Sequence, residues 1–156
     1  MASAGMAPAP VSAPQQPQQT TVSQAKLMAG ARVRAGARWF YWIAGLSLLN
    51  SVLVIAGASL HFVVGLGVTT VVDALAKNLG SAGTLLDLAI NGTVAGIFFL
   101  FGSFAGKSQK WAFIVGMVLY GLDGLLLLAF KDVLSVGFHA YALYGISRGL
   151  TAVDQA

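Results

Sequence analysis

The sequence predicts an all-α integral membrane protein, a compact bundle of four transmembrane helices with one short re-entrant or interfacial helix. Charged residues make up only 9% of the 156-residue chain and apolar types 57%, whereas about 25% of a soluble domain is charged. The mean hydropathy is +0.79. A water-soluble globule of this size has too few charges here to cover its surface, so we expect the chain to lie in a lipid bilayer.

The first 23 residues have the composition of a tail. They are rich in Ala, Pro, Gln and Ser, carry no charged side chain and contain all four prolines of the chain. Such a segment has no apolar set to bury, and its prolines oppose a helix, so we predict a disordered cytoplasmic tail. Residues 24–38 follow as a basic juxtamembrane segment, and the polytopic membrane domain is predicted over 39–150.

The first span is predicted at residues 39–58, where an uncharged run follows basic and aromatic residues. This order is typical of a helix that enters the membrane from the cytoplasm. A second basic and aromatic pair precedes the span at 111–130. We interpret the following residues as anchors at the lipid interface: Arg32, Arg34, Arg38, Trp39, Trp42, Lys110 and Trp111.

Three further runs have the length and apolarity of spans, at residues 84–105, 111–130 and 133–150. Thr84 and Asp87 have the spacing of a capping box, which predicts that a helix starts at Thr84. Asp132 is placed to cap the start of the last helix. Only Lys131 and Asp132 separate the last two runs, so they must form a tight helical hairpin, and residues 151–156 form a short C-terminal tail.

The segment 60–77 is ambiguous, because its uncharged part is short for a span and is interrupted by Gly65 and Gly67. Read as a non-crossing segment, it leaves four spans and puts seven of the nine basic residues on the side of the N-terminus. Read as a span, it gives five transmembrane helices and six basic residues on that side. The positive-inside rule favours four spans by one residue, with the N-terminus in the cytoplasm of a bacterial cell and the helices in its inner membrane.

Asp123 is the polar residue that most needs an explanation, because a charge within hydrocarbon costs about 2.5–3.5 kcal/mol on insertion scales. It lies in the predicted span 111–130, three residues after Tyr120. Asp123 and His139 each lie about eight residues from the hairpin turn, and a rise of 1.5 Å per residue puts both at roughly 12 Å below it. Asn50 falls in a similar layer. Either these residues form a proton or ion site, or they hold helices together by hydrogen bonds.

A second polar face is formed by Asp87 and Asn91, four residues apart on one predicted helix. Capping at the interface explains Asp87 more simply than a functional role. Small residues at four-residue spacing also favour close helix packing, within the chain or between copies. The glycines in these pairs are Gly92 and Gly96, Gly102 and Gly106, and Gly145 and Gly149.

The residues predict no enzyme, metal site or cofactor. The chain has no cysteine and only two histidines, and its glycine-rich stretches lack the spacing of phosphate-binding or dinucleotide-binding loops. Its basic residues lie at membrane boundaries, where they meet lipid rather than nucleic acid. We therefore expect a non-enzymatic interaction or accessory subunit, alone as a homo-oligomer or within a larger membrane complex. The alternative is a small proton- or cation-coupled transporter or channel that uses Asp123 and His139.

Overall fold

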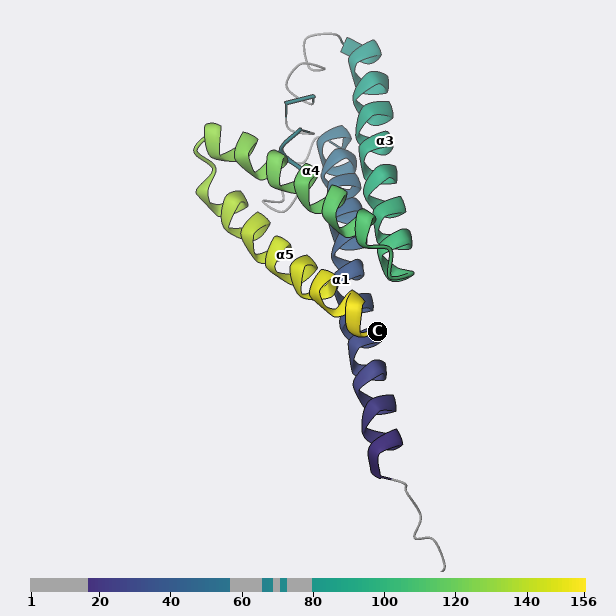
Figure 1. The fold of residues 1–156 in the computed structure, drawn as a ribbon. Coiled ribbons are helices and arrows are strands. Elements are labelled where there is room, and N and C mark those ends of the chain that lie inside the picture. The colour runs from purple at the N-terminus through teal and green to yellow at the C-terminus, as the bar shows by residue number, and fades with distance from the viewer. Residues whose placement is uncertain (1–16, 57–65, 69–70, 73–79) are drawn as a thin grey trace, which may run out of the picture.

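The computed structural model describes residues 17–56, 66–68, 71–72 and 80–156, and within them the chain is helical with no strand. The prediction of an all-α fold is confirmed. The helices are α1 (Pro17–Ile55), α3 (Gly80–Gly106), α4 (Lys110–Ala129) and α5 (Val133–Ala152), followed by the short 3₁₀ turn η2 (Val153–Gln155) (Figure 1). Most of the ambiguous segment 60–77 lies outside the described residues.

The four long helices run alternately up and down. α1 packs along α3 and α5, and α4 packs along α5. Figure 1 shows the pair α1–α3 and the hairpin α4–α5 close together near the C-terminus and apart at the opposite end. We call the end with the C-terminus the basic end, because Lys107, Lys110 and Arg148 lie there, and the other end, with the α4–α5 turn, the turn end. α1 ends and α3 begins at the turn end.

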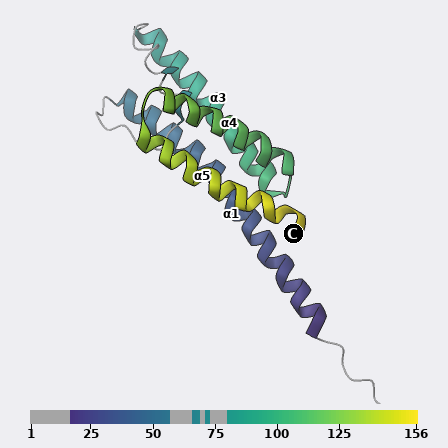
Figure 2. The same cartoon turned by 60° about the vertical axis from the view of Figure 1, so that its left-hand side comes forward.

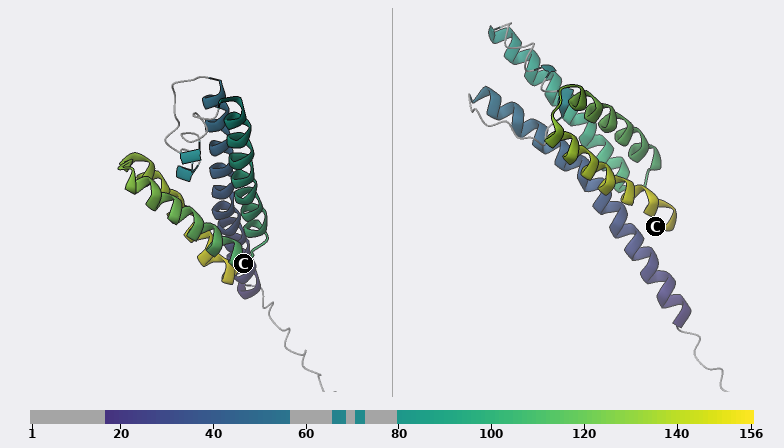
Figure 3. Two further views of the ribbon diagram at one scale, coloured as in Figure 1. Left: turned by 90° about the horizontal axis from the view of Figure 1, so that it is seen from above. Right: turned by 90° about the vertical axis from the view of Figure 1, so that its left-hand side faces the viewer.

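The first part of α1 projects beyond the basic end of the bundle (Figures 2 and 3). Its side chains there are exposed, with Leu27 and Met28 69% and 65% accessible. The helix already begins at Pro17, so the prediction that the disordered tail extends to residue 23 is wrong for 17–23. Proline is tolerated in the first turn of a helix, where its missing N–H is not needed, and the stretch that follows contains no further proline.

The core near the basic end is aromatic. The ring of Phe40 on α1 lies 6.3 Å from that of Phe98 and 6.1 Å from those of Phe101 and Phe113, measured between centroids. Gly116 on α4 leaves room for this ring, because a Cβ there would lie 2.5 Å from Phe40 Cε1. The four phenylalanines are buried, so they connect α1, α3 and α4 by packing alone.

Two of the described helices are long and apolar enough to cross a membrane, over Ala82–Gly106 and Lys110–Ala129. The four-span bundle is therefore supported at two helices only. α5 is long enough but less apolar than these two helices, because polar residues such as Ser135, His139 and Arg148 interrupt its apolar sequence. In α1 the uncharged stretch that starts at Trp39 continues into residues that the structure does not describe.

The α4–α5 turn is built as expected for a tight hairpin. The Asp132 carboxylate accepts hydrogen bonds from Ser135 N at 3.1 Å and Ser135 Oγ at 2.5 Å, so its predicted role as N-cap is confirmed. These bonds to the ionised form hold the pKa of Asp132 below its ordinary value of 3.8. Lys131 takes a left-handed backbone with φ of 60° to close the turn.

The predicted capping box at Thr84 is wrong. α3 begins at Gly80, four residues earlier, so Asp87 lies inside the helix rather than in its first turn. Its side chain is buried, at 3% exposed, and faces other polar groups of the bundle. The spacing of Thr84 and Asp87 does not mark the start of the helix here. Residues 80–83 are small and uncharged, which lets the helix extend upstream of the capping pattern.

Candidate polar site in the helical bundle

Asp123 lies on α4, and its carboxylate accepts hydrogen bonds from two backbone N–H groups. Gly67 N donates to Oδ2 at 2.6 Å, and Val68 N donates to Oδ1 at 2.8 Å. Gly67 and Val68 have helical backbone, preceded by the non-helical Leu66. Free N–H groups at the start of a helical stretch carry partial positive charge and favour a carboxylate. Asp123 therefore caps a segment that is 55 residues away from it in sequence.

His139 on α5 completes the coordination of this carboxylate. Its Nε2 lies 2.9 Å from Asp123 Oδ2, and its Nδ1 lies 2.9 Å from the carbonyl oxygen of Ser135. Asp123 is 8% exposed and His139 1%. The two side chains that the hairpin geometry places at equal depth are thus in direct contact, and we call Asp123, His139 and the N–H groups of Gly67 and Val68 the polar cluster.

The geometry restricts where protons sit in the polar cluster. A carbonyl oxygen only accepts, so His139 Nδ1 donates to Ser135. Nε2 and Asp123 Oδ2 then share one proton, either as imidazolium and carboxylate or as imidazole and carboxylic acid. Removing that proton would leave two lone pairs facing each other across 2.9 Å. The short distance between Nε2 and Oδ2 therefore requires a proton between them.

Tyr120 packs on the imidazole. The two rings are stacked with centroids 4.1 Å apart and 15° between their planes, an arrangement that stabilises an imidazolium by its contact with the π-face. The Tyr120 hydroxyl is buried and has no hydrogen-bond partner among the described residues. Gly124 allows the close approach of α5, since a Cβ there would lie 3.3 Å from His139 Cβ.

A second group of polar side chains connects α1 to α3. Asn91 Nδ2 donates to Asp87 Oδ1 at 3.0 Å and to Ser51 Oγ at 2.9 Å. Ser51 Oγ donates in turn to the carbonyl of Ser47 at 3.3 Å. All four residues are buried, and we call them the α1–α3 polar group.

The same segment that binds Asp123 also contacts the α1–α3 polar group. Leu66 N donates to Ser47 Oγ at 3.2 Å, one residue before the two N–H groups that bind Asp123. Residues 66–68 therefore bridge α1 and α4 at the level where the two helix pairs separate (Figure 1). Sequence reasoning missed this bridge, because its donors are backbone groups with no side-chain signal.

Asn50 does not join the polar cluster. The Asp123 carboxylate is bound by Gly67, Val68 and His139, and Asn50 is not among its partners. A shift of one residue turns a helix by about 100°, so Asn50 points in a different direction from Ser51, which bonds to Asn91 on α3. Equal depth alone therefore does not bring Asn50 to the Asp123 carboxylate.

The glycine pairs divide into contacts and open positions. A Cβ at Gly145 would overlap Trp39, and one at Gly102 would lie 2.9 Å from Tyr41 Cε1. At Gly149 it would lie 2.7 Å from the Cα of Gly36, a backbone contact between α1 and α5 that the four-residue spacing did not reveal. Gly106 has only ordinary contact with Ala37, at 3.9 Å.

Gly92 and Gly96 do not pack against another helix of the chain, because no described atom lies within 4 Å of a Cβ at either position. Packing of this pair between copies stays a prediction. Gly96 is exposed and Gly92 partly exposed. Spacing alone cannot tell which face of a helix meets a neighbour. Here α1 packs on the other side of α3, at Asp87, Asn91 and Ala95.

The predicted interface anchors lie around the basic end. Arg32, Arg34 and Arg38 are exposed on α1, and Lys110 Nζ forms an ion pair with Asp154. Trp42 and Trp111 are 64% and 48% exposed, and Trp39 lies between α1 and α5. Within the described ranges no three His, Cys, Asp or Glu side chains lie close enough together to hold a metal ion.

Comparisons of the chain with protein-family models, with curated proteins and with solved structures found no match. The chemistry of the site therefore rests on its own geometry. A carboxylate that binds two backbone amides and an imidazole can fix a buried segment in place.

Proposed function

We propose that the chain is a polytopic inner-membrane protein with four crossings, formed by α3, α4, α5 and the part of α1 after Trp39. The distribution of side chains supports this. In the part of the chain that the structure describes, seven polar or charged residues are buried, whereas large apolar residues such as Leu86, Phe99 and Leu122 are at least half exposed. This is the pattern of a bundle whose polar groups face inward and whose surface meets lipid.

The order of the helices supports the four-crossing arrangement over five. α1 ends and α3 begins at the turn end (Figure 1), and residues 66–68 hydrogen-bond to Ser47 and Asp123 inside the bundle, as a re-entrant segment does. With the basic end in the cytoplasm, Lys107, Lys110 and Arg148 lie on the inner side with the arginines of α1. Reporter fusions at Gln109 and at the C-terminus test this, and an external signal at Gln109 would overturn it.

The biochemical role that we propose is that of a non-enzymatic interaction or accessory subunit. The observation that carries this proposal is that both carboxylate oxygens of Asp123 already have hydrogen-bond partners. Both of its oxygens accept backbone N–H groups, and Oδ2 also bonds to His139. A carboxylate so occupied supports the structure of a buried segment, and binding a transported ion would require it to release these donors.

The projecting part of α1 is the element that we assign to partner contact. It extends away from the bundle at the cytoplasmic side (Figure 2), and Leu27 and Met28 are two-thirds exposed on it. A helix that projects into water with exposed apolar side chains is stabilised when it binds another chain. The partner is a second copy or another membrane subunit.

The test is the mass of the complex in mild detergent. The double variant Leu27→Gln and Met28→Gln should reduce the complex to the mass of the single chain. Val133 and Leu134 at the turn end are 75% and 70% exposed, so Val133→Gln and Leu134→Gln is the matched control and should leave the mass unchanged. A wild-type protein that is already a lone chain would overturn the proposal.

Proton-coupled transport is the second candidate, favoured by the one-proton pair and the buried, unpartnered Tyr120 hydroxyl beside it. If it is correct, Asp123→Asn should abolish pH-driven flux in liposomes while the helical bundle stays assembled. Asp132→Asn, a carboxylate change at the exposed turn, is the control. If the accessory role is correct, the wild type shows no such flux, and Asp123→Asn lowers thermal stability.

A further inference from the structure

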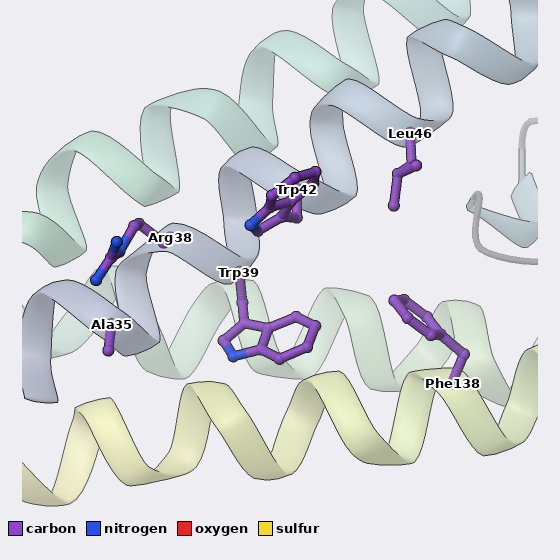
Figure 4. A pocket seen from close by; sticks show the side chains of 6 residues that line it. All are labelled: Ala35, Arg38, Trp39, Trp42, Leu46 and Phe138. Carbon is purple, nitrogen blue, oxygen red and sulfur yellow. The ribbon is translucent and has the colours of Figure 1, made fainter.

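Two grooves lie side by side between α1 and α5 at the basic end. The larger has a volume of about 380 Å³ and is lined by Ala35, Arg38, Trp39, Trp42, Leu46 and Phe138 (Figure 4). The smaller, of about 260 Å³, shares Ala35 and Trp39 with it. The indole of Trp39 therefore lies between two recesses, of a combined size in the range of small-molecule sites.

The grooves are rich in uncompensated positive charge. Arg38 lines the larger groove, and Arg32 and Arg148 line the smaller. None of the three forms an ion pair with an acidic residue of the described chain, where the ion pairs are those of Lys110 with Asp154 and His139 with Asp123. Three guanidinium groups that line two adjacent grooves favour an anion with several oxygens, because each presents a fork of N–H donors.

The lining of the larger groove changes from charged to apolar along α1. Arg38 lies at the basic end of it, whereas Trp42, Leu46 and Phe138 continue toward the turn end (Figure 4). A free anion would leave this apolar part unfilled. A molecule with an anionic head and a hydrocarbon tail fills both parts, with its head at the depth where the basic residues meet the membrane surface.

Trp39 keeps the grooves open because its position is fixed. Its ring packs edge-on against Phe138 and Tyr141, with centroids 6.2 and 5.3 Å apart. Gly145 lies directly against the Trp39 indole, since a Cβ there would overlap the ring. Any side chain at Gly145 would move the indole into one of the grooves.

We propose that these grooves bind one anionic phospholipid of the cytoplasmic leaflet, with its phosphate among Arg32, Arg38 and Arg148 and an acyl chain along Trp42, Leu46 and Phe138. This rests on the proposed membrane location of the bundle. The site goes beyond general attraction of basic residues to the membrane, because it predicts that particular arginines matter and that neighbouring basic residues do not.

The test uses tryptophan quenching in vesicles. In a Trp111→Phe background only Trp39 and Trp42 report, and both line the larger groove. Phosphatidylglycerol with brominated acyl chains should quench them more than brominated phosphatidylcholine at equal content. In the double variant Arg38→Gln and Arg148→Gln this preference should fall, by about fivefold in affinity per arginine removed.

The matched control is Arg34→Gln with Lys107→Gln. It removes the same charge from the same end of the bundle at two exposed residues outside both grooves, and it should keep the preference. Gly145→Ala should weaken quenching by phosphatidylglycerol although it leaves every charge in place. Thermal unfolding of each variant verifies that it is folded.

The proposal is overturned if the two lipids quench equally, if Arg38→Gln with Arg148→Gln behaves as its control does, or if millimolar inorganic phosphate reverses the quenching, which would mark a site for a free anion. Alkaline carbonate extraction separates this from the proposed function. A protein that stays in the membrane but shows no lipid preference disproves the lipid site only, and one that is extracted disproves both.

Discussion

The two ends of the bundle are held together by different interactions. At the turn end, where the helix pairs diverge, hydrogen bonds join α1 to α3 and α4 to α5, and residues 66–68 bridge the two pairs. At the basic end the helices touch directly, with Phe40 at the centre and Gly36 against Gly149. In the membrane location that we propose, apolar burial would give helices little reason to associate, so hydrogen bonds and close packing would be the main sources of association energy.

The difference teaches which kind of change each end tolerates. Hydrogen bonds fail when a partner is removed, because the remaining donors stay buried and unpaired. Close packing is disrupted when atoms are added, because a backbone, unlike a side chain, cannot make room by changing its rotamer. Substitutions that remove a hydrogen-bonding group should therefore destabilise the turn end most. Substitutions that enlarge a side chain should destabilise the basic end most.

The largest effect is expected for Asp123→Leu. It leaves Gly67 N, Val68 N and His139 without their acceptor, and removing one partner of a buried charged pair costs about 3–5 kcal/mol. The free energy of unfolding, measured by titration with a denaturing detergent, should fall by that amount. Leu122→Ala, at a neighbouring position that is 57% exposed, should change it little. Equal stability of the two variants would show that the polar cluster does not hold the turn end together.

Gly36→Leu tests the basic end. A Cβ at Gly36 would lie 2.6 Å from the Cα of Gly149, so α1 and α5 must separate, at a cost of about 1–3 kcal/mol. Gly45 on the same helix has nothing within 4 Å of an added Cβ, and Gly45→Leu serves as the control. If both variants have the same free energy of unfolding as the wild type, the glycine contact does not hold α1 to α5.

The smallest effect is expected at the α4–α5 turn. Asp132→Ala removes the N-cap of α5 and should cost about 1 kcal/mol. Because folding lowers the pKa of this carboxyl, its contribution is present above the ordinary value of 3.8 and is lost as the pH falls through the lowered pKa. The difference in stability between wild type and Asp132→Asn should therefore narrow below about pH 4. A difference that stays constant in this range would contradict the role of the ionised form.

The sequence predicts the contact of Asp123 with His139 better than it predicts its surroundings. A two-residue turn places both residues at one depth on adjacent antiparallel helices, so only rotation about the helix axes was undetermined. Rotation is also what separates Ser51, which bonds to Asn91, from Asn50. A pattern of residue types reports depth along a helix well and direction around it poorly, unless a long apolar face defines that direction.

Two other parts of the site leave no trace in the pattern of side chains. The donors of Gly67 and Val68 are backbone groups, and every residue except proline has such a group. The contact between Gly36 and Gly149 joins helices that are far apart in sequence, so the repeat at Gly145 and Gly149 identifies one half of it only. Such features depend on which helices become neighbours, and local sequence does not encode that choice.

The continuity of α1 has a mechanical consequence. The helix runs unbroken from Pro17 to Ile55, which is close to 60 Å at about 1.5 Å per residue, and Ser47 near its inner end bonds to Leu66. A stiff rod that pivots where Gly36 meets α5 acts as a lever. If a partner binds the outer arm as proposed, tilting that arm would displace Ser47 in the opposite direction, and with it the segment whose N–H groups bind Asp123. The proposed site of partner contact is therefore mechanically connected to the buried carboxylate.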